Sequence, residues 1–312
     1  MKAAQINSYG DQNVVKVVDD AVQPVPNSGQ VLVAVMAAGV NPFDVTVREG
    51  RARQMAELKF PATLGGDLAG KVVSVGEDVS GVSIGDHVYG QANAFSGNGS
   101  FAEFAPVSSD SIALKPNNVS FEEAAGLPLV SVSAYQAMVD HIDVQPTQKI
   151  LIHGGAGGIG SIAIQLAKHL GAYVATTASE KSREFVTSLG ADECIDYHNQ
   201  DFSTLIKDYD AVFDMIGGET NVKSYAVLRT GGILVSMVEQ PNEELLAQYN
   251  IHYIHQFTQV TTDRLTKLAG LVDSDVLKPN IDRVFNFDQA ADALAYLEQS
   301  HPRGKVVIHI AD

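Results

Sequence analysis

The sequence predicts an α/β protein of two domains: a β-rich domain built from both ends of the chain, and a doubly wound parallel sheet inserted between them. Valine-rich segments punctuated by glycine fill the first third of the chain, whereas short apolar strands alternate with helical segments over residues 149–238. The tail after residue 257 is too small to hold a core of its own, so we expect it to fold back onto the first segment. The predicted domains are 1–122 with 258–312, and 123–257.

The β-rich domain is expected to be a small, twisted barrel or sandwich. A valine-rich strand is predicted over residues 30–40, after the turn signal at 24–29. Glycines separate the later segments at short intervals, which is typical of such β domains rather than of helices. The further strands are predicted at 70–75, 86–89 and 101–107.

Helix and strand signals alternate from residue 120 onward. Ser120 followed by Glu123 has the pattern of a helix N-cap with an acidic first turn, and helix-compatible spacing continues over 124–140. A repeated strand–loop–helix pattern then indicates a parallel, doubly wound sheet. Its strands are predicted at 149–153, 173–177, 194–197, 211–215 and 233–238, with helices at 161–170 and 182–189; the tail is predicted to hold helices at 262–272 and 288–299 and strands near 284–287 and at 305–310.

Composition and charge exclude several classes of protein. The chain is 45% hydrophobic and 19% charged, as in ordinary globular proteins, and no apolar run approaches the roughly 20 residues of a membrane-spanning helix. A formal charge of −16 would repel the phosphate backbone of nucleic acids. The N-terminus lacks the layout of a secretory signal, so we expect a soluble, cytoplasmic protein. The one cysteine, Cys194, lies in an apolar run and is predicted to be a buried filler.

A glycine-rich loop, HGGAGGIG, connects a predicted strand to a predicted helix. Gly155, Gly157 and Gly160 fit the pattern G-x-G-x-x-G, in which the first glycine turns, the second lets the backbone approach a pyrophosphate and the third packs helix on strand. The pyrophosphate would lie over the helix N-terminus near Gly158 and Ile159, where N–H groups and the helix dipole favour anions. A tightly packed turn is the alternative, but strand, loop and helix are all present, so dinucleotide binding is favoured.

The dinucleotide is predicted to be NADPH. Thr177 stands at the end of the second strand, where an acidic residue would hold the ribose hydroxyls of NAD. Ser179, Lys181 and Arg183 supply a hydroxyl and two cations, which suit a 2′-phosphate. Two observations oppose this: Glu180 is available to pair with a nearby cation, and the segment also fits a solvated helix start capped by Ser179.

Several motifs, in order along the chain, resemble the quinone oxidoreductase (zeta-crystallin-like) branch of the medium-chain dehydrogenases/reductases. The resemblance spans essentially the whole chain. It implies a GroES-like catalytic domain from both chain ends, an inserted Rossmann domain, frequent dimerisation, and NADPH-dependent reduction of quinones or α,β-unsaturated carbonyls. The motifs are AAGVNPFDVTVREG at 37–50, LGGDLAGKVVSVG at 64–76, GVSIGDHVYG at 81–90, AGLPLVSVSAYQAM at 125–138, GGAGGIG at 154–160, FDMIGG at 213–218 and RGKVVIHI at 303–310.

The superfamily also contains zinc enzymes, so we compared the positions of their ligands. A catalytic zinc needs about three protein ligands, usually Cys, His and Glu. Where the zinc branch places its cysteine and its His-Glu pair, this chain has Asn41-Pro42 and Gly66-Asp67. The segment 91–100 holds no cysteine, so the structural zinc lobe is missing as well. We therefore expect a reaction without metal.

Without a metal, hydrogen bonds must polarise the substrate oxygen. The resemblance assigns Asn41 as a donor to the carbonyl and Asp44 as the residue that fixes its loop, although an aspartate at this spacing is equally often a simple cap. Many relatives carry a tyrosine two positions after that aspartate, where this chain has Thr46. The proton donor is therefore open: Thr46, Tyr89, another hydroxyl or water.

The resemblance also assigns three positions around the cofactor. Ser133 stands where relatives often have a threonine near the nicotinamide, Tyr197 matches a tyrosine near the adenosine phosphate, and Gly217 with Gly218 would approach the nicotinamide ribose. The alternatives are a back-bonded helix serine, a barrel-rim aromatic and an ordinary turn.

Two other functions were weighed. A cofactor-binding structural or sensor protein with little turnover stays open, because this branch also resembles lens crystallins and a vesicle protein. A short-chain dehydrogenase is excluded, since none of the ten tyrosines is followed by a lysine four residues later. For the assembly, the apolar segment 249–257 is predicted to be an edge strand that pairs with a second subunit in a homodimer.

Overall fold

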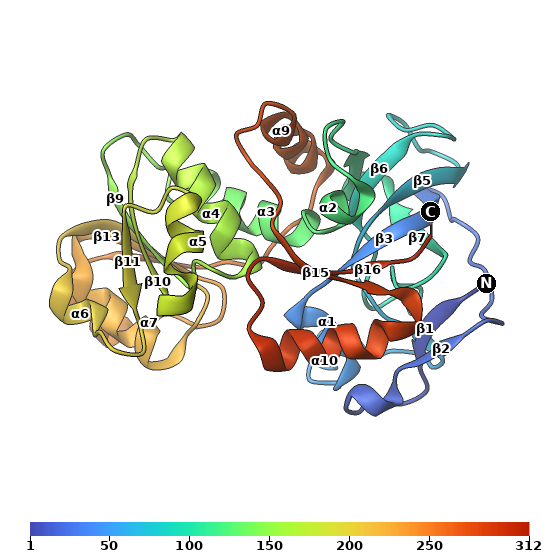
Figure 1. Ribbon diagram of the computed structural model, residues 1–312, viewed down its shortest axis with the longest axis horizontal. Helices are drawn as coiled ribbons and strands as arrows, with labels where there is room; N and C mark the ends of the chain where they lie inside the picture. The colour runs from blue at the N-terminus through green and yellow to red at the C-terminus, as the bar shows by residue number, and fades with distance from the viewer. Residues whose placement is uncertain (312) are drawn as a thin grey trace. The chain divides into compact units, whose positions relative to one another are not determined.

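The computed structural model describes residues 1–311 and divides into two compact units. The first contains Met1–Leu129, Val260–Asp275 and the chain from Pro279 onward; the second contains Val130–Gln259 and Val276–Lys278. Both chain ends therefore belong to one unit, and the α/β fold class with an inserted parallel sheet is confirmed (Figure 1).

The first unit is built on a mainly antiparallel sheet, in which β15 and β16 pair in parallel. Seven strands form this sheet in the order β15-β16-β3-β5-β6-β8, with β7 also pairing with β3, while β2-β1-β4 form a smaller sheet. The strands are β1 (Ala3–Ile6), β2 (Lys16–Val18), β3 (Gln30–Val40), β4 (Ala62–Thr63), β5 (Asp67–Val75), β6 (His87–Gln91), β7 (Phe104–Ser108), β8 (Ile112–Leu114), β15 (Ile281–Asn286) and β16 (Lys305–His309). Its helices are α1 (Pro42–Arg48), α2 (Phe121–Ala125), α9 (Thr262–Asp273) and α10 (Ala290–Ser300).

The helix predicted over 124–140 is broken in the structure. Ser120 and Glu123 do form the predicted capping box, with Glu123 N–H donating to Ser120 Oγ at 3.2 Å and Ser120 N–H to the Glu123 carboxylate at 2.8 Å. The helix they start, α2, ends at Ala125, and α3 (Pro128–Tyr135) begins afresh with proline at its first position. Because proline lacks an N–H and favours the first turn, it restarts the helix rather than continuing it. A π-helical turn follows α3.

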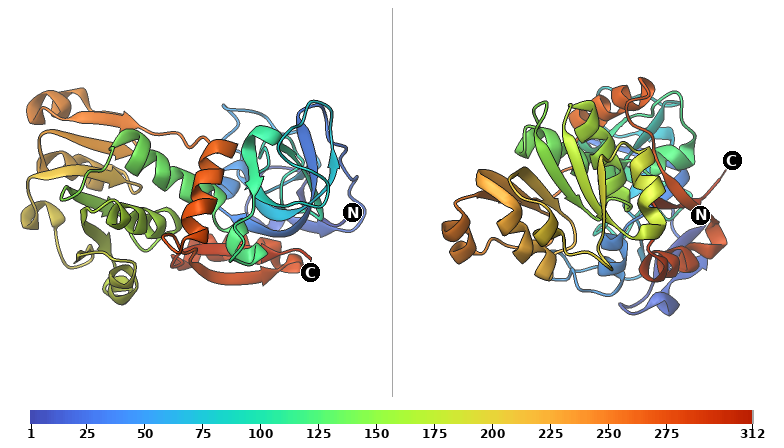
Figure 2. Two further views of the ribbon diagram at one scale, coloured as in Figure 1. Left: turned by 90° about the horizontal axis from the view of Figure 1, so that it is seen from above. Right: turned by 60° about the vertical axis from the view of Figure 1, so that its left-hand side comes forward.

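The second unit is a six-stranded parallel sheet in the order β11-β10-β9-β12-β13-β14. Helices α4 and α5 cover one face, and α6 and α7 cover the other (Figures 1 and 2). The strands are β9 (Lys149–His153), β10 (Tyr173–Ala178), β11 (Glu193–Asp196), β12 (Tyr209–Asp214), β13 (Leu228–Ser236) and β14 (His252–His255), and the helices after α3 are α4 (Gly158–His169), α5 (Arg183–Ser188), α6 (Phe202–Leu205), α7 (Gly218–Ser224) and α8 (Glu243–Tyr249). In such a sheet the loops at the carboxyl ends of the strands, where the order reverses beside β9, bind ligands.

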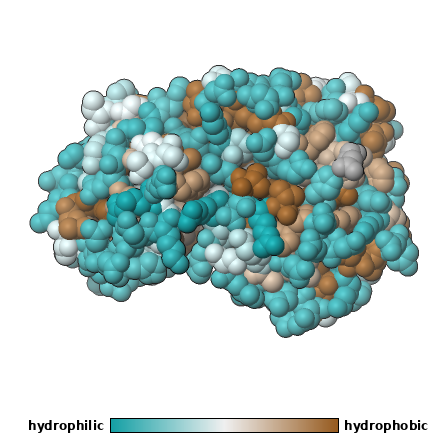
Figure 3. Space-filling model, viewed as in Figure 1, coloured by the Kyte–Doolittle hydropathy of each residue, from teal (hydrophilic) through white to brown (hydrophobic). Residues whose placement is uncertain are grey.

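The surface is mainly polar on the face shown in Figure 3, where apolar residues gather only in small groups. Within residues 1–311, every helix is too short or too polar to cross a bilayer.

Arg48 is the largest fully buried side chain of the first unit, and it joins three segments that are distant in sequence. Its Nε donates to the Gly10 carbonyl at 3.1 Å, and its two terminal nitrogens donate to the Glu298 carboxylate of α10 at 3.0 and 3.3 Å. The guanidinium therefore links α1 to an N-terminal loop and to the last helix.

We expect Arg48→Met to lower the free energy of unfolding by about 2–4 kcal/mol, because it leaves a carbonyl and a carboxylate without their buried donor. Arg51→Met is the matched control: this side chain is 62% exposed and pairs with Glu49 only, so the loss should stay below about 0.5 kcal/mol. Urea unfolding of both variants provides the measurement. Equal losses would show that the buried guanidinium does not hold the chain ends together.

Candidate functional site

The glycine-rich loop joins β9 to α4 in the second unit, as predicted. The turn is closed by the Gly157 N–H, which donates to the Gly154 carbonyl at 3.0 Å, so Gly155, the glycine predicted to turn, lies at its centre. Gly154 before it has a φ of +70°, which favours glycine. A side chain on Gly155 would overlap Thr176, and one on Gly160 would overlap the Gly154 carbonyl. Backbone conformation at Gly154 and packing at Gly155 and Gly160 therefore favour glycine without any ligand.

Gly157 differs from these three glycines. Its φ of −76° suits any residue, and an added Cβ would meet no atom closer than 3.4 Å. It is the N-cap of α4, and the first helical bond runs from Ser161 N–H to its carbonyl, so the N–H groups of Gly158, Ile159 and Gly160 have no helical partner. The helix has 12 residues, and packing within the protein does not need glycine at its N-cap. An N-terminus of this kind fits the pyrophosphate of a dinucleotide.

Thr177 faces the interior. Its hydroxyl lies 3.1 Å from His153 Nδ1 and accepts the Gly154 N–H at 3.2 Å, and the other ring nitrogen of His153 lies 3.0 Å from Ser224 Oγ. Burial lowers the pKa of His153 to about 4, so this imidazole is neutral at physiological pH. Thr177 thus holds the start of the glycine loop through its hydroxyl.

The basic segment after β10 contains an internal ion pair. Arg183 donates to both carboxylate oxygens of Glu180 at 2.7–2.9 Å and to the Cys194 carbonyl at 2.8 Å. This contact lowers the pKa of Glu180, as expected for a carboxylate beside a guanidinium. The cation that we assigned to a 2′-phosphate is therefore already paired. Cys194 is buried, with the pKa of its thiol raised by burial, which agrees with its predicted role as a filler.

Ser179 and Lys181 occupy the turn between β10 and α5. Ser179 is the N-cap residue of a short 3₁₀ turn that includes Lys181, but its hydroxyl donates to the Ser182 hydroxyl at 3.3 Å and accepts no backbone N–H of that turn. The alternative in which Ser179 acts as a side-chain cap is therefore not what the structure shows.

An open pocket of about 400 Å³ lies at the carboxyl ends of β11 and β12. Tyr197, 54% exposed, forms one wall together with the residues that lead into α6. The opposite wall comes from α7, where Lys223 is paired with Asp201 at 2.8 Å and with Glu219 at 2.9 Å. An exposed aromatic ring beside a half-polar pocket at this edge of a parallel sheet is suited to a nucleoside.

The turn after β12 is held by one carboxylate. Asp214 accepts the N–H groups of Ile216 and Gly217 at 2.9 and 3.0 Å and the Asn221 side-chain amide at 2.8 Å. Gly217 has a φ of +77°, and a side chain there would meet Glu239 at 2.8 Å, so the turn itself demands glycine. Both predicted interpretations of Gly217, an ordinary turn and a close approach to a ligand, fit this geometry.

Ser133 is fully buried within the second unit. Its hydroxyl lies 2.6 Å from Thr258 Oγ1, and its carbonyl accepts Gln256 Nε2 at 2.9 Å. Gln256 Oε1 is buried without a hydrogen-bond partner. The segment after β14 is therefore tied to α3 by side chains, and it carries an unused acceptor beside the predicted cofactor serine.

In the first unit, Asn41 and Asp44 start α1. Asp44 is fully buried and accepts the Asn41 N–H at 2.7 Å, so it is both a helix cap and the residue that fixes this loop. Burial raises the pKa of Asp44 to about 7, and the nearby Asp67 adds to that rise.

The amide of Asn41 is held at both ends. Its Nδ2 donates to Asp67 Oδ2 at 2.9 Å, and its Oδ1 accepts Lys305 Nζ at 2.5 Å. Asp67 also accepts Gln91 Nε2 at 3.1 Å and the Leu129 N–H at 3.2 Å. The structure thus places three strands, β5, β6 and β16, around one side chain that the sequence analysis named as a candidate.

The two named candidates for the proton donor differ. The Tyr89 hydroxyl is buried and donates to the Leu265 carbonyl at 2.6 Å, and burial raises its pKa well above the ordinary value, so it is removed from the alternatives. Thr46 Oγ1 is half-buried and donates to the Pro42 carbonyl at 3.2 Å, a back-bond within α1.

The positions where zinc enzymes of the superfamily place their ligands hold Asn41, Gly66 and Asp67. Across residues 1–311, no three His, Cys, Asp or Glu side chains are grouped as a metal site would need. Reduction without metal stays a prediction.

Comparison with known proteins decides the family. Residues 27–117 match the alcohol dehydrogenase GroES-like domain, and residues 189–308 match a family described as zinc-binding dehydrogenase. The chain is 36% identical to a quinone oxidoreductase from Coxiella burnetii, with a TM-score of 0.90 over 99% of both chains. It is 38% identical to the chloroplastic NADPH-dependent alkenal/one oxidoreductase of Arabidopsis thaliana, over 99% of this chain and 79% of that protein. The chain belongs to the quinone oxidoreductase-like family of the medium-chain dehydrogenases/reductases.

Two further members of the family are informative. The 2-methylene-furan-3-one reductase of Solanum lycopersicum is also 38% identical, over 99% of this chain and 79% of that protein. The Escherichia coli quinone oxidoreductase complexed with NADPH is 25% identical, with a TM-score of 0.90 over 99% of this chain and all of that one. This chain is accordingly an NAD(P)H-dependent oxidoreductase of the quinone oxidoreductase or alkenal reductase type.

Sequence reasoning missed the partners of its own candidates. Lys305 and His153 were placed at the ends of predicted strands and Gln91 just after one, and none of the three was given a role. Each is a polar residue inside or at the end of an otherwise apolar strand, and that is the one signal by which they could have been found.

The two glycines at the start of α4 provide a test that separates packing from ligand binding. We expect Gly157→Ala to weaken NADPH binding about tenfold or more, the equivalent of one charge-assisted hydrogen bond, with stability changed by less than about 0.5 kcal/mol. Gly160→Ala should lower stability by about 1–3 kcal/mol, because the methyl group overlaps a carbonyl. Calorimetric titration and urea unfolding measure both, and equal instability of the two variants would assign Gly157 to packing.

Proposed function

We propose that this chain reduces quinones or α,β-unsaturated carbonyl compounds with NADPH and without a metal. The observation that carries the proposal is the Asn41 amide, which is 3% exposed and fixed by a carboxylate and an ammonium on its two sides. The names of the two plant relatives, which describe an alkenal/one oxidoreductase and a reductase of an unsaturated furanone, support the same substrate class.

The chemistry of the first unit follows from the hydrogen-bond inventory of an amide. Asn41 Nδ2 carries two N–H groups, and Asp67 accepts one of them, so one remains for a substrate oxygen. When bound, NADPH supplies the hydride. Addition of hydride to the β-carbon of an enone places negative charge on the carbonyl oxygen, and the remaining N–H of Asn41 stabilises that charge. Thr46 or water then protonates the α-carbon of the enolate.

The second unit is proposed to hold the dinucleotide along the carboxyl edge of its sheet. The N–H groups of Gly158, Ile159 and Gly160 bind the pyrophosphate, and the pocket beside Tyr197 takes the adenosine. Gly217 approaches the nicotinamide ribose, and Ser133 with its partners lies at the nicotinamide end.

The preference for NADPH is proposed to rest on Lys181, Arg183 and Ser179. A 2′-phosphate is a stronger partner for a guanidinium than a solvent-exposed carboxylate is, so it displaces Glu180 from Arg183. Thr177 contributes indirectly, because a threonine there leaves no carboxylate to repel the phosphate.

The assembly and location predicted from the sequence remain proposals. Strand β14 is an outer strand of the parallel sheet, which supports pairing with a second subunit in a homodimer. A cytoplasmic location stays a prediction, since the Arabidopsis relative is chloroplastic.

The primary experiment measures NADPH oxidation with a panel of quinones and enones, in the presence and absence of a chelator. We expect turnover with at least one of these classes, a lower KM for NADPH than for NADH, and no effect of the chelator. Tight NADPH binding without turnover on any acceptor would support the alternative of a structural or sensor protein. Loss of activity that zinc restores would overturn the metal-free mechanism.

The phosphate site is tested by three side chains. Lys181→Ala combined with Arg183→Ala should raise the KM for NADPH about tenfold or more and change that for NADH little, because only NADPH carries the 2′-phosphate. Glu180→Gln should lower the KM for NADPH, since it removes the carboxylate that competes for Arg183. Steady-state kinetics with both cofactors measure the effect, and equal changes with NADPH and NADH would refute the assignment.

A further inference from the structure

Lys305 is a buried lysine that the proposed mechanism does not use. It is the first residue of β16, and the next residue, Val306, pairs with Val40 of β3, so the lysine lies beside the turn from β3 into α1. Its side chain is 6% exposed, and Nζ donates to the Val40 carbonyl at 2.7 Å and to Asn41 Oδ1 at 2.5 Å. The backbone register of two strands therefore places an ammonium group on the oxygen of the candidate amide.

This ammonium determines how the Asn41 amide is oriented. A cation at Oδ1 and a carboxylate at Nδ2 exclude the flipped amide, in which a donor would face Lys305 and an acceptor would face Asp67. The free N–H of Nδ2 is then the only polar group that Asn41 has left. A positive charge on the oxygen also draws electron density from the amide nitrogen, which makes that N–H a stronger donor.

The carboxylate of Asp67 balances the charge of Lys305, and its side chain is buried. Its Oδ2 lies 4.0 Å from Lys305 Nζ, and its remaining contacts are neutral donors from Asn41, Gln91 and the backbone of Leu129. Asp44 is the other carboxyl group near the lysine. Burial lowers the pKa of Lys305, whereas the two carboxylates oppose that shift.

Stability alone does not account for this arrangement. Burying a lysine and an aspartate costs several kcal/mol per ion before their attraction is counted, and apolar side chains of similar volume usually stabilise a core at least as well. A buried ion pair that touches a candidate substrate-binding amide is better explained by chemistry at that amide.

We propose that Lys305 is a positioning residue that orients and polarises the Asn41 amide, so that a side-chain ammonium supports the developing negative charge on the substrate oxygen. This inference rests on the proposed function, because it requires Asn41 to bind the carbonyl oxygen. Lys305 acts through Asn41 and does not itself touch the substrate.

The two classes of acceptor separate this role from a structural one. A weakly electrophilic enone depends on polarisation of its carbonyl, whereas an electron-poor quinone accepts hydride with much less help. Loss of the ammonium should therefore slow enone reduction more than quinone reduction. A general disturbance of the fold would slow both equally.

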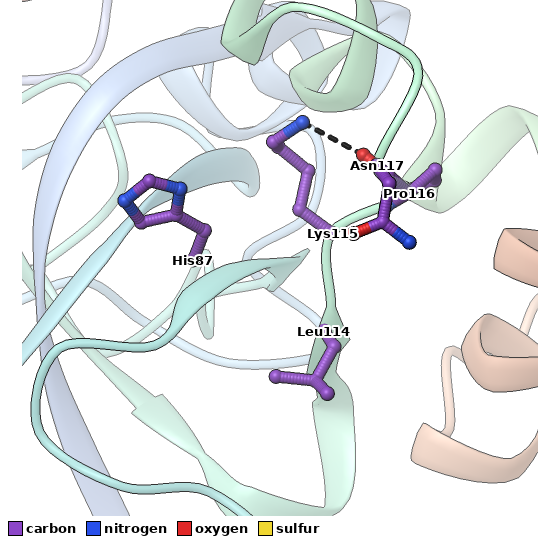
Figure 4. Close-up of a pocket in the computed structure, with 5 residues that line it drawn as sticks. All are labelled: His87, Leu114, Lys115, Pro116 and Asn117. Carbon is purple, nitrogen blue, oxygen red and sulfur yellow. Dashed lines mark hydrogen bonds between the residues drawn. The ribbon is translucent and has the colours of Figure 1, made fainter.

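The experiment compares Lys305→Met with Lys115→Met. Lys115 is a second partly buried lysine of the same unit, and with Pro116 it lines a small surface pocket, where its Nζ donates to the Pro116 carbonyl (Figure 4). It also donates to the Val119 carbonyl. Lys305→Met should lower kcat for an enone about tenfold or more, which is one-tenth to one-hundredth of the loss typical for a direct oxyanion donor. It should change kcat for an electron-poor quinone less than threefold and leave NADPH binding unchanged. Lys115→Met should leave both rates unchanged. Equal loss with both acceptors would overturn the proposal.

A double-mutant cycle with Asn41→Ala separates this inference from the proposed function. Because Lys305 acts through Asn41, adding Lys305→Met to Asn41→Ala should change enone turnover less than twofold. If Asn41→Ala alone leaves turnover intact, the proposed function of Asn41 fails. If Asn41→Ala slows the enone but Lys305→Met does not, only the role of Lys305 fails.

Asp67→Asn provides a second variant should Lys305→Met not fold. It removes the charge that balances the ammonium and replaces one of the two carboxylate oxygens, which accept from Asn41, Gln91 and Leu129, by an NH₂ donor, so the same selective loss with enones is expected. Unchanged enone turnover, or equal loss with enones and quinones, would contradict the proposal.

Discussion

The antiparallel pairing of β16 with β3 is the constraint on which the first unit depends. Val306 to His309 lie opposite Val40 to Ala37, and this register joins the two ends of the chain in one sheet. The same pairing brings Lys305 to the exact turn where β3 ends and the Asn41 loop begins. A shift by one residue would turn every side chain of β16 to the other face of the sheet, and the ammonium would leave the amide. Packing of the core and polarity of the site are therefore set by one register.

The glycine loop shows how the needs of the fold and those of a ligand are distinguished. Backbone conformation favours glycine at position 154, and close packing within the second unit favours it at positions 155 and 160. Gly157 has neither requirement, which supports the proposed approach of a pyrophosphate at this position. A motif read from sequence treats its glycines alike, whereas the structure separates those that the fold needs from the one that it does not.

Periodicity and glycine spacing predicted the architecture well, because strands and helices bury regular faces and the resemblance covered the whole chain. They failed where a long-range contact decides the outcome. The sequence placed Thr177 at the end of the second strand but gave no partner for its hydroxyl, which lies 3.1 Å from Nδ1 of His153, 24 residues earlier. The pairing of Arg183 with Glu180, by contrast, is local, and the sequence offered it as an alternative. Lys305 could not be placed beside Asn41, since the pairing of strands that are more than 260 positions apart leaves no local pattern.

The position of Lys305 on the last strand has a consequence for how the protein is made. The parallel sheet of the second unit is complete once β14 has been synthesised, so the dinucleotide-binding unit has all of its strands while β16 is still missing. Asn41, near the other end of the chain, gains its ammonium only when that final strand docks. In the proposed mechanism, the strands of the unit that would hold the reductant therefore precede, in the order of synthesis, the strand that polarises the Asn41 amide.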